Sequence, residues 1–157
     1  MTTPMDVPPG GVDMEARQTS SSRLIKASPQ EVFDILADPS NHVLIDGSGT
    51  VSANKGDPER LEPGAKFGMV MRLKVLPYRI QNTIVEFEEP NLIAWRHMGH
   101  HRWRYELEEV EGGTLVTETF DWSTSKVPIV LEKAGYPQMH LANIRRTLDK
   151  LAELAEA

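Results

Sequence analysis

The C-terminal segment constrains the fold most strongly, because it reads as one long amphipathic helix that begins near Pro137. A shorter helix is expected just before it, over about residues 129–134, with a break at Gly135. The long helix repeats its apolar residues three and four positions apart, so they form one stripe over about five turns. The stripe consists of Leu141, Ile144, Leu148, Leu151 and Ala155. Such a stripe must be buried against an apolar surface supplied by the rest of the chain.

That surface is predicted from residues 50–124, where the apolar residues change to a period of two. Proline and glycine turn signals separate the segments, as at Glu89-Pro90 and Gly112-Gly113. Consecutive strands with short turns favour an antiparallel sheet over a parallel one. The predicted strands cover residues 50–54, 66–75, 78–88, 92–98, 101–110 and 114–124.

The N-terminal part adds one strand and two helices to this pattern. A polar strand is expected over residues 19–27, and a helix follows it. Ser28 is the predicted N-cap, Pro29 takes the first helical position, and Glu31 completes a capping box. Residues 40–46 are expected to form a short second helix or turn.

Composition narrows the class of protein. Residues 1–17 are rich in proline and glycine, so we expect a disordered tail before a domain over residues 18–157. The chain has no cysteine, which excludes disulfides, thiolate zinc sites and a cysteine nucleophile and fits a cytoplasmic protein. A net charge of -6 argues against nucleic-acid binding. No apolar run is long enough for stable membrane insertion.

Three segments resemble the START-like helix-grip (SRPBCC) superfamily, in the branch of polyketide cyclase/dehydrase and lipid transport proteins. They are ASPQEVFDILADPSNH (27–42), IVEFEEPNLIAWR (84–96) and YELEEVEGGTLVTETFDW (105–122). With the last helix, the resemblance covers about residues 19–156. It implies an α+β helix-grip fold, in which a curved antiparallel sheet of about six or seven strands wraps around a long C-terminal helix. It also implies a cavity between sheet and helix. Many relatives carry an aromatic residue shortly after the first helix, where this chain reads HVLID (42–46).

Strand alternation predicts which side chains would line that cavity, because alternate residues share one face of a sheet. The inward set is rich in large aromatic residues and methionine, which suit the wall of an apolar pocket. The resemblance adds a histidine near the cavity mouth. The same aromatic residues could instead fill an ordinary core. The expected lining residues are Met69, Met71, Trp95, Trp103, Tyr105, Glu118, Phe120, Trp122, His140 and Ile144.

Glu118 is the sharpest anomaly in this set, because its neighbours at two-residue spacing are apolar. A buried, unpaired carboxylate is costly and has a raised pKa, so a partner such as His97, Tyr105 or Arg96 is expected. Glu118 would then be a polar anchor or an acid/base group. Alternatively, a β-bulge reverses the register and leaves Glu118 in solvent.

The remaining polar residues receive plainer interpretations. His97, His100 and His101 lie in the turn HMGHH, whose spacing is not a standard metal-ligand pattern, so we expect a solvated turn and no metal. His42 is expected at the surface or as a cap. The strand arginines are expected on the solvated face of the sheet, or in a docking patch for an acidic partner. These arginines are Arg72, Arg79, Arg96, Arg102 and Arg104.

Three functional hypotheses follow. The first is a carrier or sensor of an apolar small molecule such as a lipid, fatty acid or polyketide-like compound, acting as a monomer or homodimer without cofactor. The second is a polyketide cyclase, aromatase or dehydratase, with Glu118 and His97 as the candidate catalytic residues. The third is an interaction scaffold with a filled cavity. No nucleophile elbow, HExxH or phosphate-loop motif is present, so the sequence leaves enzymatic activity open.

Overall fold

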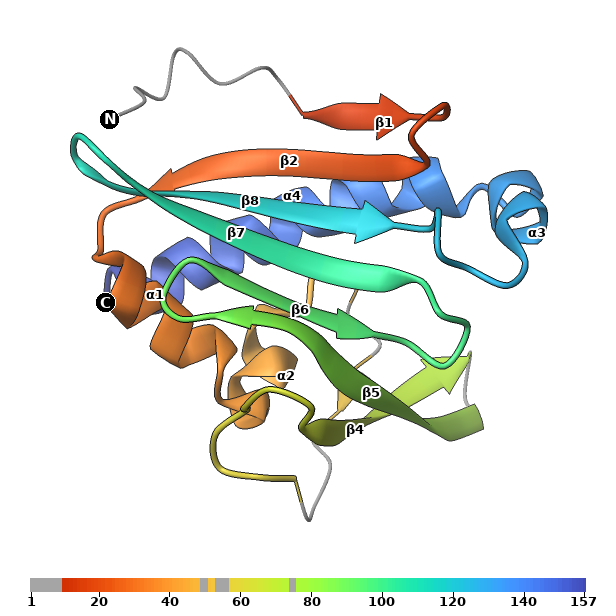
Figure 1. The fold of residues 1–157 in the computed structure, drawn as a ribbon, viewed down its shortest axis with the longest axis horizontal. Coiled ribbons are helices and arrows are strands. Elements are labelled where there is room, and N and C mark those ends of the chain that lie inside the picture. Colours follow the sequence, from red (N-terminus) through yellow and green to blue (C-terminus); the bar gives the residue numbers. More distant parts are fainter. Residues whose placement is uncertain (1–9, 49–50, 53–56, 74–75) are drawn as a thin grey trace.

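The computed structural model describes residues 10–48, 51–52, 57–73 and 76–157, without the side chains of residues 51–52, 69 and 71–73. In this part of the chain, one antiparallel sheet has the strand order β1-β2-β8-β7-β6-β5-β4-β3, and helix α4 lies behind it (Figure 1). The strands are β1 (Gly11–Asp13), β2 (Gln18–Ile25), β3 (Val51–Ser52), β4 (Lys66–Leu73), β5 (Leu76–Glu88), β6 (Leu92–Arg96), β7 (Arg102–Val110) and β8 (Gly113–Asp121). The helices are α1 (Pro29–Leu36), the 3-10 helix η2 (Pro39–Asn41), α2 (His42–Ile45), α3 (Pro128–Lys133) and α4 (Tyr136–Ala155). The predicted α+β helix-grip fold is confirmed.

Strand β1 corrects the expectation of a disordered tail for part of residues 1–17. Gly11–Asp13 pair with β2, with Val12 opposite Thr19. The turn after β1 is fixed by a hydrogen bond from the Ala16 N–H to the Asp13 carboxylate, at 2.9 Å. Val12 also packs against the core. Pairing and packing therefore order this segment despite its composition, and it adds a strand to the six or seven expected.

The predicted capping box at the start of α1 is confirmed. The Ser28 hydroxyl accepts a hydrogen bond from the Glu31 N–H at 3.2 Å, and the Glu31 carboxylate accepts one from the Ser28 N–H at 2.9 Å. Two otherwise unpaired backbone groups are thereby satisfied. The helix buries Val32, Phe33 and Leu36 against the sheet and α4.

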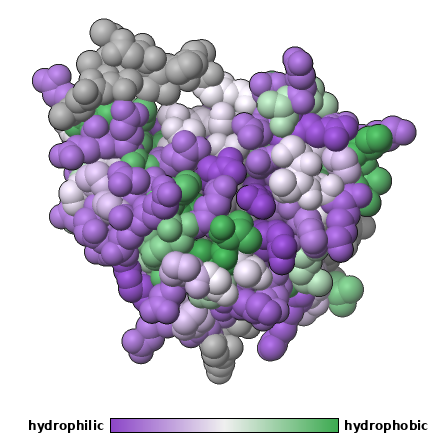
Figure 2. All heavy atoms as spheres, viewed as in Figure 1, coloured by the Kyte–Doolittle hydropathy of each residue, from purple (hydrophilic) through white to green (hydrophobic). Residues whose placement is uncertain are grey.

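The two faces of the sheet differ as alternation predicts. Tyr105 and Leu107 of β7 are buried in the interior, whereas Glu106 and Glu108 are exposed on the outer face. Figure 2 shows that the face turned away from α4 is mostly hydrophilic. The pairing of β5 with β6 shifts register between Ile84 and Glu86. The inward and outward side chains of the two strands therefore stay on the same faces of the sheet on both sides of the shift.

The expectation of solvated strand arginines is corrected for Arg102 and Arg104, whereas Arg79 is exposed as expected and the side chain of Arg72 lies outside the described residues. Arg104 binds both carboxylate oxygens of Glu86, at 2.7 and 3.0 Å, and lies 3.8 Å from the Asp121 carboxylate. Arg102 approaches Glu86 at 3.5 Å. These arginines are half-buried in an ion-pair network, so they do not form a free cationic patch.

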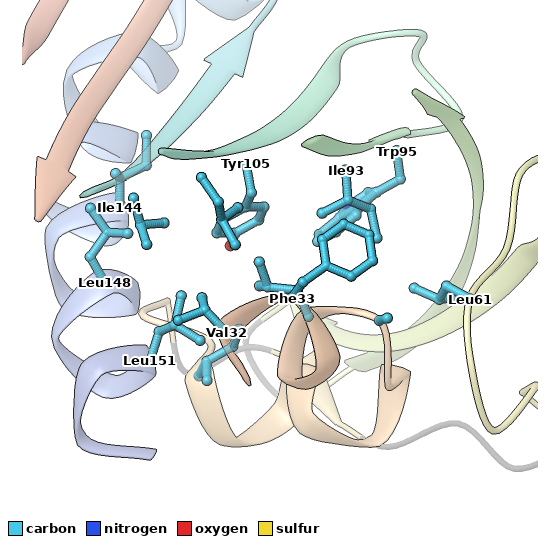
Figure 3. Packing of buried hydrophobic residues seen from close by; sticks show 14 of the residues in the cluster. Val32, Phe33, Leu61, Ile93, Trp95, Tyr105, Ile144, Leu148 and Leu151 are labelled. Carbon is cyan, nitrogen blue, oxygen red and sulfur yellow. The ribbon is translucent and has the colours of Figure 1, made fainter. Parts of the chain in front are cut away.

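The core lies between the inner face of the sheet and the helices. Ile144, Leu148 and Leu151 of α4 point into it and are fully buried (Figure 3). Tyr105 and Trp95 reach the same interior from the strands (Figure 3). Among the helices that the structure describes, none combines the length and hydropathy needed to cross a bilayer.

The segment after α2 is fastened tightly to α4. The Gly47 N–H donates to the Thr147 hydroxyl at 2.9 Å, and the Gly47 carbonyl accepts from Arg146 at 2.8 Å. A Cβ at position 47 would lie 2.2 Å from the Asn143 carbonyl oxygen, so only glycine allows this approach.

Replacing Leu148 with alanine should lower the free energy of unfolding by about 2–5 kcal/mol, because it removes a fully buried side chain and leaves a cavity. Glu153→Ala, at an exposed position of the same helix, should change it by less than about 0.5 kcal/mol. Urea denaturation measures both values. Equal losses in the two variants would contradict the assignment of the buried face of α4.

Candidate functional site

The candidate site is the interior between the inner face of β4–β8 and the helices α1, α2 and α4. Rings from several elements contact one another across it. His42 stacks on Trp95 with centroids 4.9 Å apart, and Trp95 lies 5.5 Å from Tyr105. Further along, Trp103 lies 5.0 Å from Phe120. The interior is therefore rich in aromatic rings that contact one another.

Glu118 lies in this aromatic interior, where only 2% of its surface is exposed. It faces Tyr105 across the β7–β8 pair, and the Tyr105 hydroxyl donates a hydrogen bond of 2.7 Å to its Oε1. The other oxygen, Oε2, is buried without a hydrogen-bond partner. The prediction that Glu118 points inward is confirmed, and of the three partners expected, His97, Tyr105 and Arg96, the structure shows Tyr105.

The environment of Glu118 favours its neutral form. Burial, together with a smaller effect of the Asp46 carboxylate, raises the pKa of Glu118 to about 8 against the opposing hydrogen bond from Tyr105. The pKa of Tyr105 is raised well above its ordinary value, mainly by burial and by Glu118. Near neutral pH the pair is therefore largely a protonated carboxyl beside a protonated phenol.

His42 is buried rather than at the surface, and it takes the other expected role, since its ring caps the carbonyl of Leu36 at the end of α1. It opens α2, which turns into the interior, and its ring also lies 5.1 Å from Phe67. Its Nε2 lies 2.9 Å from the Leu36 carbonyl oxygen, which can only accept, so Nε2 carries the proton. The buried Nδ1 is then an acceptor without a partner. Burial lowers the pKa of His42, so the ring is neutral.

Asn82 is a site residue that the sequence analysis missed. It lies on β5 between Ile80 and Ile84, faces Phe67 of β4 in the register, and is 1% exposed. Both its Oδ1 and its Nδ2 are buried without partners. The period-two pattern IQNTI at residues 80–84 could have identified it.

The expectation of a solvated turn is corrected for His97 and His101, which lie with His140 at one end of the interior. His97 and His101 stack with centroids 4.4 Å apart, and His101 lies 5.3 Å from Phe120. His140 of α4 packs on Phe120 at 4.4 Å and on Trp103 at 4.9 Å. Burial lowers the pKa of His101 to about 3 and of His140 to about 4, and it also lowers the pKa of His97.

The remaining predicted lining residues are placed as follows. Trp122 is fully buried, stacks on Phe120, and donates its indole N–H to Glu132 at 3.0 Å, so it ties β8 to α3. Ile144 is fully buried on α4. Met69 and Met71 lie on β4, but their side chains fall outside the described residues.

A surface groove and a metal centre are the other kinds of site that a domain of this size could carry. A groove of about 390 Å³ lies on the outer face of the sheet, with Glu106, Glu108 and Leu115 among its lining residues, and it is separate from the interior. In the part of the chain that the structure describes, no three His, Asp or Glu side chains are grouped closely enough to hold a metal ion.

An antiparallel sheet closed by a long C-terminal helix around an aromatic interior defines a START-like helix-grip domain. The family model described as polyketide cyclase / dehydrase and lipid transport matches residues 16–156, and the chain belongs to this family.

Known proteins place the chain among bacterial relatives. An uncharacterised protein of Mycobacterium tuberculosis (strain H37Rv) is 37% identical over 147 residues, which cover 90% of this chain and 66% of that protein. The chain therefore matches a little under two thirds of that relative's length. Crystal structures of a Nitrosomonas europaea protein (16% identity, TM-score 0.68, 92% of this chain and 97% of that one) and a Rhodobacter sphaeroides protein (16%, 0.69, 94% of each) share the fold.

The titration of Glu118 should make the protein less stable as the pH rises. Unfolded glutamate has a pKa of about 4.3, whereas the pKa of Glu118 in the folded protein is about 8. The unfolded chain therefore loses this proton first, and the free energy of unfolding falls across that window by at most about 1.4 kcal/mol per pH unit. Glu118→Gln should flatten this dependence in denaturant titrations. Parallel curves for the two proteins would show that Glu118 titrates normally.

Proposed function

We propose that the protein binds an apolar small molecule in the interior between the sheet and α4. The observation that carries this proposal is the buried Oε2 of Glu118, which has no hydrogen-bond partner inside an aromatic wall. Leaving such a polar atom unpaired costs about 1–3 kcal/mol. A guest that supplied the missing hydrogen bond would offset this cost, and burial of its apolar surface would add roughly 25 cal/mol per Å².

The exposure of the inward-facing rings supports access to this interior. Trp103, His101 and His140 contact the buried ring of Phe120, yet each keeps part of its surface exposed. Solvent therefore reaches this end of the interior, beside the first turn of α4. A small molecule could reach the aromatic wall by the same side.

A binding assay with the uncharged apolar dye Nile red tests the proposal. Trp103→Ala should weaken dye binding by about tenfold, because the indole is part of the accessible wall. Leu115→Ala is the matched control, since Leu115 is buried near the outer face, and it should leave the affinity unchanged. Equal affinities in the wild type and the Trp103 variant, after correction for stability, would count against this wall. Absence of dye binding would favour a scaffold with a filled interior.

A second candidate function, a cyclase or dehydratase, is favoured by the Tyr105–Glu118 pair. An acid with a pKa of about 8 can give or take a proton near neutral pH, and its Oε2 is free to meet a reacting oxygen. His97, the other catalytic candidate, instead stacks on His101 at the β6–β7 turn.

If this second function holds, Glu118→Gln should slow product formation from a polyketide chain by about 100-fold or more, since general acid–base catalysis contributes this much. Chromatography of the products measures the rate, and Glu106→Gln on the exposed outer face is the control. An unchanged rate in the Glu118 variant would remove this residue from the mechanism.

A further inference from the structure

Three buried residues around the proposed site hold polar atoms without partners. The atoms are Oε2 of Glu118, Nδ1 of His42, and Oδ1 and Nδ2 of Asn82. Their side chains lie along one connected path, because His42 contacts Phe67 and Trp95, Phe67 pairs with Asn82, and Trp95 leads to Tyr105. Buried polar atoms are ordinarily paired, so a set of them on one wall points to a ligand that supplies the partners.

The hydrogen-bonding role of each atom can be assigned. His42 donates from Nε2 to the Leu36 carbonyl, so Nδ1 requires a donor. Glu118 accepts from Tyr105 through Oε1, so a proton on its carboxyl is available at Oε2 and requires an acceptor. Asn82 offers one acceptor and two donors. A hydroxyl group can satisfy any of the three, whereas a carbonyl can satisfy Glu118 and Asn82.

The charges around this wall oppose an anion. Among the side chains that the structure describes, no lysine or arginine is buried, and the buried polar residues around the site are neutral near pH 7. The charged group that acts on both Glu118 and Tyr105 is the carboxylate of Asp46. A carboxylate head group placed here would be desolvated beside like charge and without a buried counter-ion among the described side chains, which is strongly unfavourable.

We propose that this site selects an uncharged, largely apolar molecule bearing hydroxyl or carbonyl oxygens, held by Glu118, His42 and Asn82, and that it discriminates against carboxylates such as free fatty acids. This inference rests on the proposed function and narrows its ligand class. The discrimination arises from the absence of a buried cation among the described residues and from the nearby Asp46.

Three matched aromatic probes test the inference on the wild-type protein by isothermal titration calorimetry near neutral pH. 2-Naphthol carries a hydroxyl, naphthalene carries no polar group, and 2-naphthoate carries a carboxylate on the same ring system. We expect the affinity for 2-naphthol to exceed the affinity for naphthalene by about tenfold. It should exceed the affinity for 2-naphthoate by a larger factor. Equal affinities, or a preference for 2-naphthoate, would overturn the inference while leaving the proposed apolar site standing. Binding of none of the three would overturn both.

Variants connect the selectivity to the named atoms. Glu118→Leu should abolish the advantage of 2-naphthol over naphthalene, whereas Glu118→Gln keeps a neutral donor and should retain most of it. Glu106→Leu, on the exposed face of the neighbouring strand, is the matched control and should change neither affinity. An unchanged 2-naphthol preference in the folded Glu118→Leu variant would overturn the role assigned to Glu118.

Discussion

The packing of α4 on the inner face of the sheet is the interaction on which the rest of the structure depends. Ile144, Leu148 and Leu151 exclude water from one side of the interior, and the strands supply the other side. Polar contacts then fix the helix in register. The Thr19 hydroxyl donates to the Pro137 carbonyl at 3.0 Å, and Arg23 pairs with Asp149. The burial that results is what makes the carboxyl group of Glu118 chemically unusual.

Those parts of the fold that depend on local chemistry were predictable from the sequence. The capping box of Ser28 and Glu31 is a contact within one turn, and the alternation of Tyr105 and Leu107 needs only one strand. Strand β1 could not be predicted in this way, because its order comes from pairing with β2 and composition argues against it. The shift near Ile84 in β5 is likewise set by neighbouring strands, since the pattern of one strand does not reveal a bulge.

The same distinction holds for the candidate site. Glu118 was predictable because it breaks an otherwise apolar alternation, but its partner was left among three residues until the strand register placed Tyr105 opposite it. His42 was not, because its burial depends on how η2 and α2 turn toward Trp95, a contact between residues far apart in sequence. In the segment HVLID after the first helix, the imidazole ring of His42 is the ring that packs on Trp95. This ring keeps a flat face toward Trp95 and adds a hydrogen-bonding atom.

The close approach of Gly47 to α4 has a consequence for how molecules reach the interior. Both backbones and the Thr147 and Arg146 side chains are joined there, so a guest passing along that seam would have to separate main chains as well as side chains. His140 lies about two turns earlier on the helix than Arg146 and Thr147, before this fastening begins. If the interior admits a small molecule as proposed, entry would be easier near the start of the helix than along the segment that Gly47 fastens, and a larger residue at position 47 would push this segment away from α4.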